Sequence, residues 1–306
     1  MDKIYDLIIL GSGPAGLAAA IYAQRARLGT LTLEKEYISG GQVMNTYEVD
    51  NYPGLPGIGG FELGMKFREH ADQLGAEFKV AEVKHILIED TVKKVETTEG
   101  TFSAKALILA MGAKHRQLGV SGEKELSGMG VSYCATCDGA FFKGRTVIVV
   151  GGGDVAVEDA IFLARICEKV YLVHRRDELR AAKSLQEKLF SCDNVEILWD
   201  FAVTQISGED HVEAVKLQNT KTQERKNLPV DGVFVAVGIT PNSEVLQNVV
   251  DLNEQGYVIA AEDGVTNVDG IFAAGDIRTK MLRQIVTATS DGANAVTSVQ
   301  NYLIHR

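Results

Sequence analysis

Two cysteines three residues apart are the residues of this sequence whose possible chemical roles are easiest to identify. Cys134 and Cys137 stand in the run Cys-Ala-Thr-Cys-Asp-Gly, with Asp138 directly after the second thiol. Such a pair either ligates a metal or cycles between dithiol and disulfide, and the pKa of one of its thiols is often lowered. A cycling dithiol needs a proton source, which Asp138 provides if partial burial raises the pKa of its carboxyl. Asp followed by Gly139 is also a common turn, so both interpretations of Asp138 stay open.

The metal interpretation is weakened because ligands are missing. A structural zinc site normally has four ligands, and one Cys-x-x-Cys pair supplies two. The other two cysteines, Cys167 and Cys192, are isolated, and three of the histidines, His85, His115 and His211, show no ligand spacing. We therefore expect no metal, and we expect Cys167 and Cys192 to be ordinary core or surface thiols.

Composition sets the broad class of protein. The chain has 306 residues, 45% of them hydrophobic, which is enough for two domains with their own cores. Its formal net charge of -10 offers no diffuse basic surface for nucleic-acid phosphates. It has no apolar run of about 18 residues that would span a membrane, and its N-terminus is unlike a signal peptide. We expect a soluble, cytoplasmic protein that binds neither nucleic acid nor membrane.

The elements that must position the dithiol occur in two similar units. Each unit has a buried strand, a glycine-rich turn, a helix and a second strand, in that order. The first unit has a strand at 5–10, the turn at 11–16, a helix at 17–29 and a strand at 30–34. The second has a strand at 146–150, the turn at 151–156, a helix at 157–167 and a strand at 169–176. This repeated order predicts an α/β fold with two Rossmann-like dinucleotide-binding domains.

Each glycine-rich turn has the spacing of a dinucleotide-binding loop in the context that such a loop requires. The first glycine of each turn allows the chain to reverse, the second admits a pyrophosphate against the backbone, and the third small residue lets helix and strand pack closely. The positive end of the helix dipole then faces the phosphates. These positions are Gly11, Gly13 and Gly16 in the first unit and Gly151, Gly153 and Ala156 in the second.

The end of the second strand distinguishes the two units. In the first unit it carries Glu34, whose carboxylate accepts hydrogen bonds from ribose hydroxyls and repels a 2′-phosphate, so this unit is expected to hold FAD or NAD. In the second unit the same place is His174, followed by Arg175, Arg176 and Arg180. Guanidinium groups suit a phosphate, which points to NADP. The alternative is a solvated, charged strand end.

The remaining segments add two matched strands, and the C-terminal part of the chain completes the first unit. Apolar strands are expected at 105–116, 231–242 and 270–277, and a helix follows at 284–303. Asp276, at the end of the last strand, is placed to bind a polyol hydroxyl, or else it is a simple turn or helix cap. We predict a discontinuous FAD-binding domain, 1–113 and 245–306, with the NADPH-binding domain, 114–244, inserted between its parts and carrying the dithiol.

Several motifs along the whole chain resemble those of one family. They are Gly-Ser-Gly-Pro-Ala-Gly at 11–16, Gly-Gly-Gln at 40–42, Asn-Tyr-Pro-Gly at 51–54, Cys-Ala-Thr-Cys-Asp-Gly at 134–139, Gly-Gly-Gly-Asp-Val-Ala at 151–156, His-Arg-Arg-Asp-Glu-Leu-Arg-Ala at 174–181, Gly-Ile-Phe-Ala-Ala-Gly-Asp at 270–276 and Arg-Gln at 283–284. The chain resembles the low-molecular-weight, bacterial-type thioredoxin reductases, which are class II pyridine nucleotide-disulfide oxidoreductases. A dithiol between two nucleotide units is the most specific part of this pattern.

The resemblance implies a fold and a division of labour. Both domains are expected to be of the three-layer ββα type. Electrons pass from NADPH through FAD and the dithiol to thioredoxin or a thioredoxin-like disulfide protein, and the enzyme is a homodimer. Cys137 lies nearer the flavin, Cys134 attacks the partner's disulfide, and Asp138 is the acid and base. The two nucleotide domains rotate in turn, with the crossings near 113–119 and 238–244 as the hinge.

The resemblance also implies the cofactor-binding residues. Those expected to hold FAD are Gly11, Gly13, Pro14, Ala15, Gly16, Glu34, Gly41, Gln42, Asn51, Gly112, Gly275, Asp276, Arg283 and Gln284. Those expected to hold NADPH are Gly151, Gly153, Asp154, Val155, Ala156, His174, Arg175, Arg176 and Arg180.

The sequence departs from the family pattern at a few positions, and there are alternatives to the reductase function. The departures are Met111, Val155, Val237, Thr289 and Ser290, of which Val155 replaces a hydroxyl in the second glycine-rich turn. One alternative is a ferredoxin-dependent reductase or a dithiol oxidase, but such relatives usually lack the second glycine-rich turn and the arginines. A peroxiredoxin-reducing relative would need a further N-terminal domain, for which we expect no room before Gly11. The last alternative is a non-catalytic flavoprotein that senses redox state.

Overall fold

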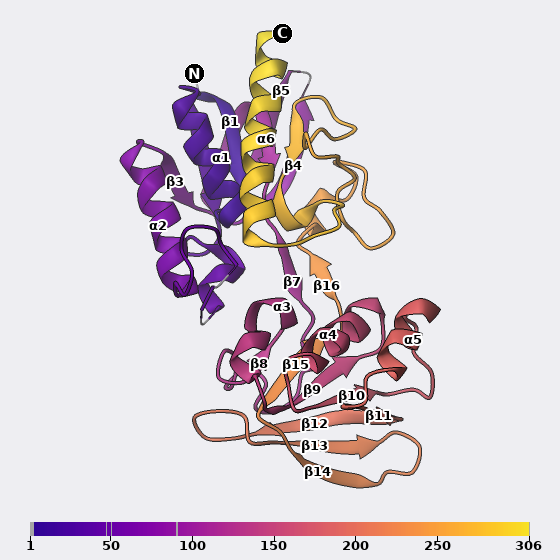
Figure 1. Ribbon diagram of the computed structural model, residues 1–306. Helices are drawn as coiled ribbons and strands as arrows, with labels where there is room; N and C mark the ends of the chain where they lie inside the picture. The colour runs from indigo at the N-terminus through magenta and orange to yellow at the C-terminus, as the bar shows by residue number, and fades with distance from the viewer. Residues whose placement is uncertain (1–2, 47, 50, 90, 306) are drawn as a thin grey trace. The chain divides into compact units, whose positions relative to one another are not determined.

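The chain folds as two units, of which the second interrupts the first (Figure 1). The computed structural model describes residues 3–46, 48–49, 51–89 and 91–305. The first unit comprises 1–114 and 240–306, and the second comprises 115–239. The chain crosses between them in two short strands, β7 (Ala113–His115) and β16 (Ile239–Pro241), which pair with each other.

A parallel sheet forms the centre of the first unit. Strands β3, β2, β1 and β6 are parallel neighbours in that order, and β17 pairs in parallel with β6. Beside β17, the first residues of β6 pair with β5, which is antiparallel to β6 and to its other neighbour, β4. Four successive residues of β1, from Leu7 to Leu10, are fully buried, as expected for a strand covered on both faces. The bounds are β1 (Ile4–Leu10), β2 (Thr30–Glu34), β3 (Glu77–Val80), β4 (Val83–Glu89), β5 (Val92–Thr97), β6 (Gly100–Leu109) and β17 (Ile271–Ala273).

Alternate residues of β1 contact different layers. Leu7 and Ile9 pack against helices α1 (Pro14–Arg25) and α6 (Ile285–Ile304), which lie side by side. Ile8 and Leu10 pack against the antiparallel pair β4 and β5. The first unit therefore has three layers: helices, a parallel sheet and a smaller antiparallel sheet. The remaining elements are α2 (Gly60–Gln73) and the 3-10 turns η1 (Gly41–Asn45), η3 (Glu244–Leu246) and η4 (Gly275–Ile277).

The second unit has the same three layers. Its five parallel strands follow the order β11, β10, β9, β15, β8, with one face covered by α4 and α5 and the other by an antiparallel sheet of β12, β13 and β14. The strands are β8 (Val131–Ser132), β9 (Thr146–Gly151), β10 (Lys169–His174), β11 (Val195–Trp199), β12 (Phe201–Ser207), β13 (Ala214–Asn219), β14 (Arg225–Pro229) and β15 (Gly232–Ala236). The helices are α3 (Ala135–Asp138), η2 (Gly139–Phe142), α4 (Asp154–Ala164) and α5 (Lys183–Phe190).

The predicted fold class is confirmed, and the strand-turn-helix-strand units are found where the sequence indicates. The helix ends differ from the prediction. Helices α1 and α4 begin inside the glycine-rich turns, at Pro14 and Asp154, and α1 ends at Arg25, four residues before the predicted glycine stop. Arg27 has a φ of 56°, a left-handed conformation that a helix does not continue through. Among the described residues, no helix is long and apolar enough to cross a membrane.

Candidate active site

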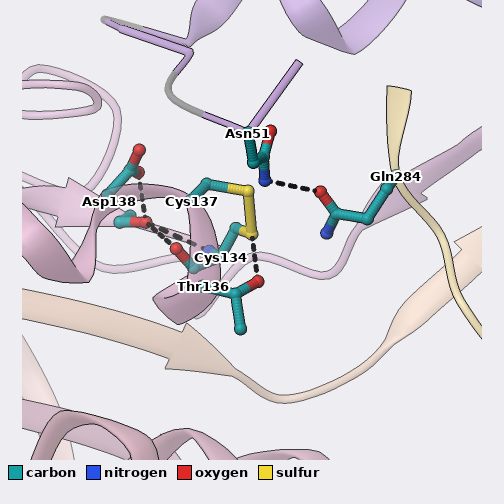
Figure 2. The surroundings of a disulfide bond; sticks show 7 residues. Asn51, Cys134, Thr136, Cys137, Asp138 and Gln284 are labelled. Atoms are coloured by element: carbon teal, nitrogen blue, oxygen red, sulfur yellow. Dashed lines mark hydrogen bonds between the residues drawn. A yellow bond between two sulfur atoms is a disulfide. The ribbon is translucent and has the colours of Figure 1, made fainter. Parts of the chain in front are cut away.

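The two cysteines form a disulfide at the edge of the second unit's parallel sheet. Strand β8 ends at Ser132, and Cys134 is the N-cap of the single helical turn α3 that contains Cys137 (Figure 2). Their Cα atoms are 5.3 Å apart, and both side chains are partly buried. Short sequence separation and a helical turn thus hold the sulfurs together. Cys167 is buried and Cys192 is partly buried, and both are free thiols.

A serine connects the disulfide to the carboxyl group beside it. The hydroxyl of Ser132 donates to Asp138 Oδ2 at 2.6 Å and accepts the backbone N–H of Cys134 at 3.0 Å. Ser132 is 5% exposed. The sequence analysis missed this residue, although a hydroxyl two positions before the first cysteine is visible in the sequence. Ser132 fixes both the start of α3 and the position of the Asp138 carboxyl.

Asp138 has the environment of a proton donor. Its Oδ1 is buried and has no hydrogen-bond partner within the part of the chain that the structure describes. Burial raises the pKa of the Asp138 carboxyl, and the hydrogen bond from Ser132 opposes that rise. A turn residue would need neither the buried oxygen nor the bond to the N-cap region of the dithiol helix. These contacts favour the acid-base interpretation of Asp138.

The first glycine-rich turn packs closely against the backbone of the strand and helix next to it. Gly11 has a φ of 102°, and a Cβ there would lie 2.5 Å from the carbonyl oxygen of Ala110. A Cβ on Gly16 would lie 1.9 Å from the carbonyl oxygen of Gly11, so only glycine lets α1 start this close to the turn. Gly13 faces open space apart from the backbone of Gly41, which leaves the helix N-terminus accessible to a phosphate.

Glu34, which was predicted to bind ribose hydroxyls, forms hydrogen bonds with the glycine-rich turn of its own unit. Its Oε2 accepts the backbone N–H of Ser12 at 2.8 Å and the Ser12 hydroxyl at 2.9 Å, and its Oε1 accepts the N–H of Glu36 at 3.1 Å. The carboxylate is therefore oriented before any ligand arrives, and Oε1 retains a free lone pair. Ser12 is fully buried and was not identified from the sequence.

Asp276 is the clearest sign of a ligand in the first unit. It lies in η4, after β17, and its Oδ1 is buried without a hydrogen-bond partner among the described residues. Burial raises the pKa of its carboxyl, while the nearby cations Lys280 and Arg283 oppose that rise. A buried, unpartnered acceptor suits a polyol hydroxyl.

A buried ion cluster holds the segment that carries Asp276. Asp291, on α6, accepts the N–H of Gly275 at 2.9 Å and pairs with Arg278 at 2.6 Å and with Lys280 at 2.9 Å. The three charged side chains are each 6% exposed. Although burial opposes ionisation of Asp291, these contacts hold the pKa of its carboxyl below the ordinary value. The cluster fixes Gly275 and therefore the backbone next to Asp276. No motif in the sequence indicates this cluster.

Most of the other residues expected to hold FAD also have defined places. Asn51 donates to Gln284 Oε1 at 3.0 Å, and Gln284 is the N-cap of α6 in a capping box with Thr287 (Figure 2). Gln42 donates to the carbonyl of Ala113. Arg283 lies over the ring of Tyr257 at 4.1 Å, and its buried Nε has no hydrogen-bond partner among the described residues.

The first residues of α1 also meet the Asp276 segment. Pro14 is the first residue of the helix, and Ala15 is 4% exposed. A Cβ on Gly275 would lie 2.8 Å from that of Ala15. Gly112, with a φ of 64°, has nothing near the place of its missing Cβ. The glycine-rich turn, Glu34 and Asp276 thus belong to one unit with an unpartnered acceptor and an open helix N-terminus, which fits a dinucleotide such as FAD.

The second glycine-rich turn is built differently. A Cβ on Gly152 would lie 2.3 Å from the ring of His174, which is buried against it. Gly153 faces open space, and Val155 is 59% exposed. Burial lowers the pKa of the His174 imidazole, and Arg180 and Arg176 lower it further. His174 therefore fills space as a neutral ring beneath the turn.

Hydrogen bonds connect this turn to the segment that carries the arginines. Asp154 Oδ1 accepts the N–H of Ala182 at 2.7 Å, and Arg180 donates its N–H to the carbonyl of Gly152 at 2.8 Å. The side chains of Arg175, Arg176 and Arg180 are exposed, and none is in an ion pair with any residue that the structure describes. Three unpaired guanidinium groups after β10 suit a phosphate.

These two dinucleotide turns and the disulfide define a class of protein, and comparison with known proteins agrees. The model of the pyridine nucleotide-disulphide oxidoreductase family matches residues 5–292, and the chain belongs to this family. It is similar to a thioredoxin reductase of Bacillus subtilis, 49% identical over 303 residues, which are 99% of this chain and 96% of that one. A thioredoxin reductase of Listeria monocytogenes is 48% identical over 99% of this chain and 95% of that one. The solved thioredoxin reductase of Streptococcus pyogenes is 43% identical, with full coverage of both chains and a TM-score of 0.95.

Proposed function

We propose that this protein is an NADPH-dependent thioredoxin reductase. Electrons pass from NADPH through FAD to the Cys134–Cys137 disulfide, and from the reduced dithiol to the disulfide of thioredoxin or a thioredoxin-like protein. The observation that carries the proposal is the disulfide in a chain with two glycine-rich turns, with Ser132 bonded both to the N–H of Cys134 and to an Asp138 carboxyl whose other oxygen is buried without a partner among the described residues. Similarity to thioredoxin reductases over 99% of the chain supports the choice of partner.

Each cysteine has a separate role in the proposed exchange. The thiolate of Cys134 attacks the partner's disulfide, which forms a mixed disulfide and releases one partner thiolate. The thiolate of Cys137 then attacks Cys134 Sγ, which restores the internal disulfide and releases the second partner thiolate. Asp138 donates a proton to a departing thiolate, and the hydrogen bond from Ser132 at 2.6 Å supports this role by orienting its carboxyl.

The first unit supplies the proposed flavin site. When bound, FAD provides the group that accepts a hydride from NADPH and passes an electron pair to a disulfide. The N-terminus of α1 and Gly13 hold its pyrophosphate, Glu34 its adenosine ribose, and Asp276 a polyol hydroxyl. The FAD-binding domain is 1–113 with 245–306, and the remaining predicted FAD residues line the same site.

The proposed NADPH-binding domain, residues 114–244, contains the second unit and supplies the NADPH site. The N-terminus of α4, at Gly153, Asp154 and Val155, faces the pyrophosphate. Arg175, Arg176 and Arg180 bind the 2′-phosphate that separates NADPH from NADH. We further propose that the enzyme acts in the cytoplasm as a homodimer, as its resemblance to the bacterial-type reductases implies.

Anaerobic mixing with each nicotinamide nucleotide tests the proposed donor. Flavin absorbance should bleach fast with NADPH and much more slowly with NADH. Replacing both arginines, Arg175→Ala with Arg176→Ala, should reduce the rate constant for bleaching by NADPH by about 100-fold, because two charge-assisted contacts to phosphate are lost. Arg225→Ala, an exposed arginine on β14, is the control. Absence of bleaching by either nucleotide would contradict the assignment of NADPH and would favour a ferredoxin-type donor or a sensor.

The Asp138→Asn variant tests the proposed acid. Without the acid, thioredoxin reduction should slow by about 100-fold, and the decline in rate as pH rises past the raised pKa of Asp138 should disappear. The same raised pKa means that the wild type loses unfolding free energy as pH increases from the ordinary aspartate pKa through the folded value. Asp138→Asn should lack this loss in urea unfolding.

A second carboxylate in the same unit provides a matched control for the Asp138→Asn variant. Asp210→Asn, on an exposed loop of the same unit, removes the same formal charge and should leave the rate and the pH profile unchanged. If Asp138→Asn keeps the full rate and pH profile of thioredoxin reduction, Asp138 is only a turn residue.

A further inference from the structure

The tip of a β-hairpin lies against the strand end that carries the arginines. The hydroxyl of Thr220, after β13, donates to the carbonyl of Arg175 at 3.4 Å. The N–H of Thr220 donates to the carbonyl of Asp200 at 2.6 Å, and the N–H of Asp200 donates to the carbonyl of Arg176 at 3.3 Å. The hairpin tip, the β11–β12 corner and the arginine segment are thus joined through backbone groups.

Lys221, at this tip, pairs with two carboxylates that border the arginines. Its Nζ donates to Asp177 Oδ2 at 2.8 Å and lies 3.0 Å from Asp200 Oδ1, an ion pair without hydrogen-bond geometry. The hydrogen bond from Lys221 lowers the pKa of the Asp177 carboxyl, and the pKa of Lys221 is raised in turn. Asp177 directly follows Arg176 in the chain, yet it pairs with a lysine 44 positions away.

Side chains of the hairpin tip bond to its own backbone and define its conformation around Lys221. The Oδ1 of Asn219 accepts the N–H groups of Lys221 and Thr222, each at 2.9 Å. Gln223 completes the turn with a φ of 63°, and its Oε1 accepts a hydrogen bond from Gln218 at 2.6 Å. Such side-chain bonds to the backbone define a tight turn without tertiary help.

We propose that Lys221 is a specificity-determining residue for NADPH, because it withdraws the Asp177 carboxylate from Arg175 and Arg176 and leaves both guanidinium groups free for the 2′-phosphate. The inference rests on the proposed function of the second unit. A free Asp177 would act twice against the phosphate, by pairing with an arginine and by repelling a second negative charge. The carboxylate of Asp200 is held by the same lysine and is 16% exposed.

Replacing Lys221 and replacing Asp177 should have opposite effects on nucleotide binding. Lys221→Met should weaken binding of adenosine 2′,5′-bisphosphate by about fivefold and leave binding of 5′-AMP unchanged, in line with a solvent-exposed ion pair. Asp177→Asn should strengthen binding of the bisphosphate slightly. The double variant should bind it about as tightly as the wild type, because the carboxylate that Lys221 restrains has been removed.

Calorimetric titration of the FAD-loaded enzyme with both nucleotides, at low ionic strength, measures these differences, and the ratio of kcat/KM for NADPH to that for NADH should follow them. Lys216→Met, on the exposed side of the same hairpin, removes an equal charge and should change neither. If the wild type binds both nucleotides equally, the NADPH assignment itself fails. If the wild type prefers the bisphosphate but Lys221→Met does not change that preference, or if the double variant stays as weak as Lys221→Met, Lys221 does not act through Asp177.

Discussion

The two glycine-rich turns follow one backbone plan with different residues under the turn. In the first, the residue after the leading glycine is Ser12, and the strand end supplies Glu34, which accepts both the N–H and the hydroxyl of that serine. In the second, the corresponding residues are Gly152 and His174, and the imidazole occupies the place where a side chain at 152 would be. In each turn the two residues fit each other. Replacing one of them without the other should therefore disturb the contact.

Under the proposed function, this difference adapts one motif to two nucleotides. Where the strand end must carry a negative charge, the turn supplies donors that orient it. Where the strand end must accept a phosphate, the neutral ring of His174 fills the space beneath the turn. The positive charges lie on the exposed arginines that follow. The spacing of the glycines therefore identifies a dinucleotide turn, and the pair beneath it indicates which dinucleotide.

The largest expected effect is at the third small residue of the two turns. Gly16→Ala should reduce the free energy of unfolding by about 3 kcal/mol and strip FAD from the purified protein, because the new Cβ would lie 1.9 Å from the carbonyl oxygen of Gly11. The reverse change in the second unit, Ala156→Gly, should cost only about 1 kcal/mol, the difference in helix propensity. Thermal unfolding and flavin content measure both. Equal losses would mean that the two turns are packed alike.

A smaller loss is expected where the ring of His174 meets the turn. Gly152→Ala should cost about 2 kcal/mol of unfolding free energy, since its Cβ would lie 2.3 Å from that ring. Adding His174→Ala should recover most of this loss, because the obstructing ring is then gone. Urea unfolding of the single and double variants gives the coupling between the two sites. Purely additive losses would contradict the pairing of Gly152 with His174.

The corresponding pair in the first unit should govern affinity more than stability. Glu34→Gln removes the charge from the hydrogen bonds to Ser12, and we expect FAD to bind about tenfold more weakly. Fluorescence titration of apoprotein with FAD measures the change, with Glu36→Gln as the neighbouring control. Unchanged affinity would limit Glu34 to supporting the turn.

The smallest effect is expected at Val155, which departs from the family pattern. Its side chain is 59% exposed in the first turn of α4, so Val155→Thr should lower the KM for NADPH by about twofold through one added hydroxyl and leave the melting temperature unchanged. Its counterpart in the first unit, Ala15, is 4% exposed, and Ala15→Thr should instead destabilise the fold. Steady-state kinetics and thermal unfolding separate the two outcomes.

Local patterns in the sequence were enough to predict the layers of the fold and several site residues. Glycine spacing located both turns, and the charges of Glu34 and Arg175 indicated different nucleotides. Both predictions were possible because each charged residue follows the first glycine of its own turn within about 25 residues. Ser132 and Ser12 were missed although each lies near a predicted site residue, since a lone serine has no distinctive spacing. Asp291 and Lys221 act only through tertiary contacts that no local pattern encodes.

The pairing of β6 has a consequence for the order in which the protein is made. One edge of β6 contacts β5 over its first residues and β17 over Leu107 to Leu109, so the sheet lacks a strand until residue 273 has left the ribosome. Helix α6, whose Gly292 lies against Ala15, is synthesised later still. The second unit, by contrast, is a continuous segment that ends at residue 239 and has all its strands by then. The turn at Gly11 is synthesised before the second unit, yet it belongs to the unit whose sheet can be completed only after the second unit is made.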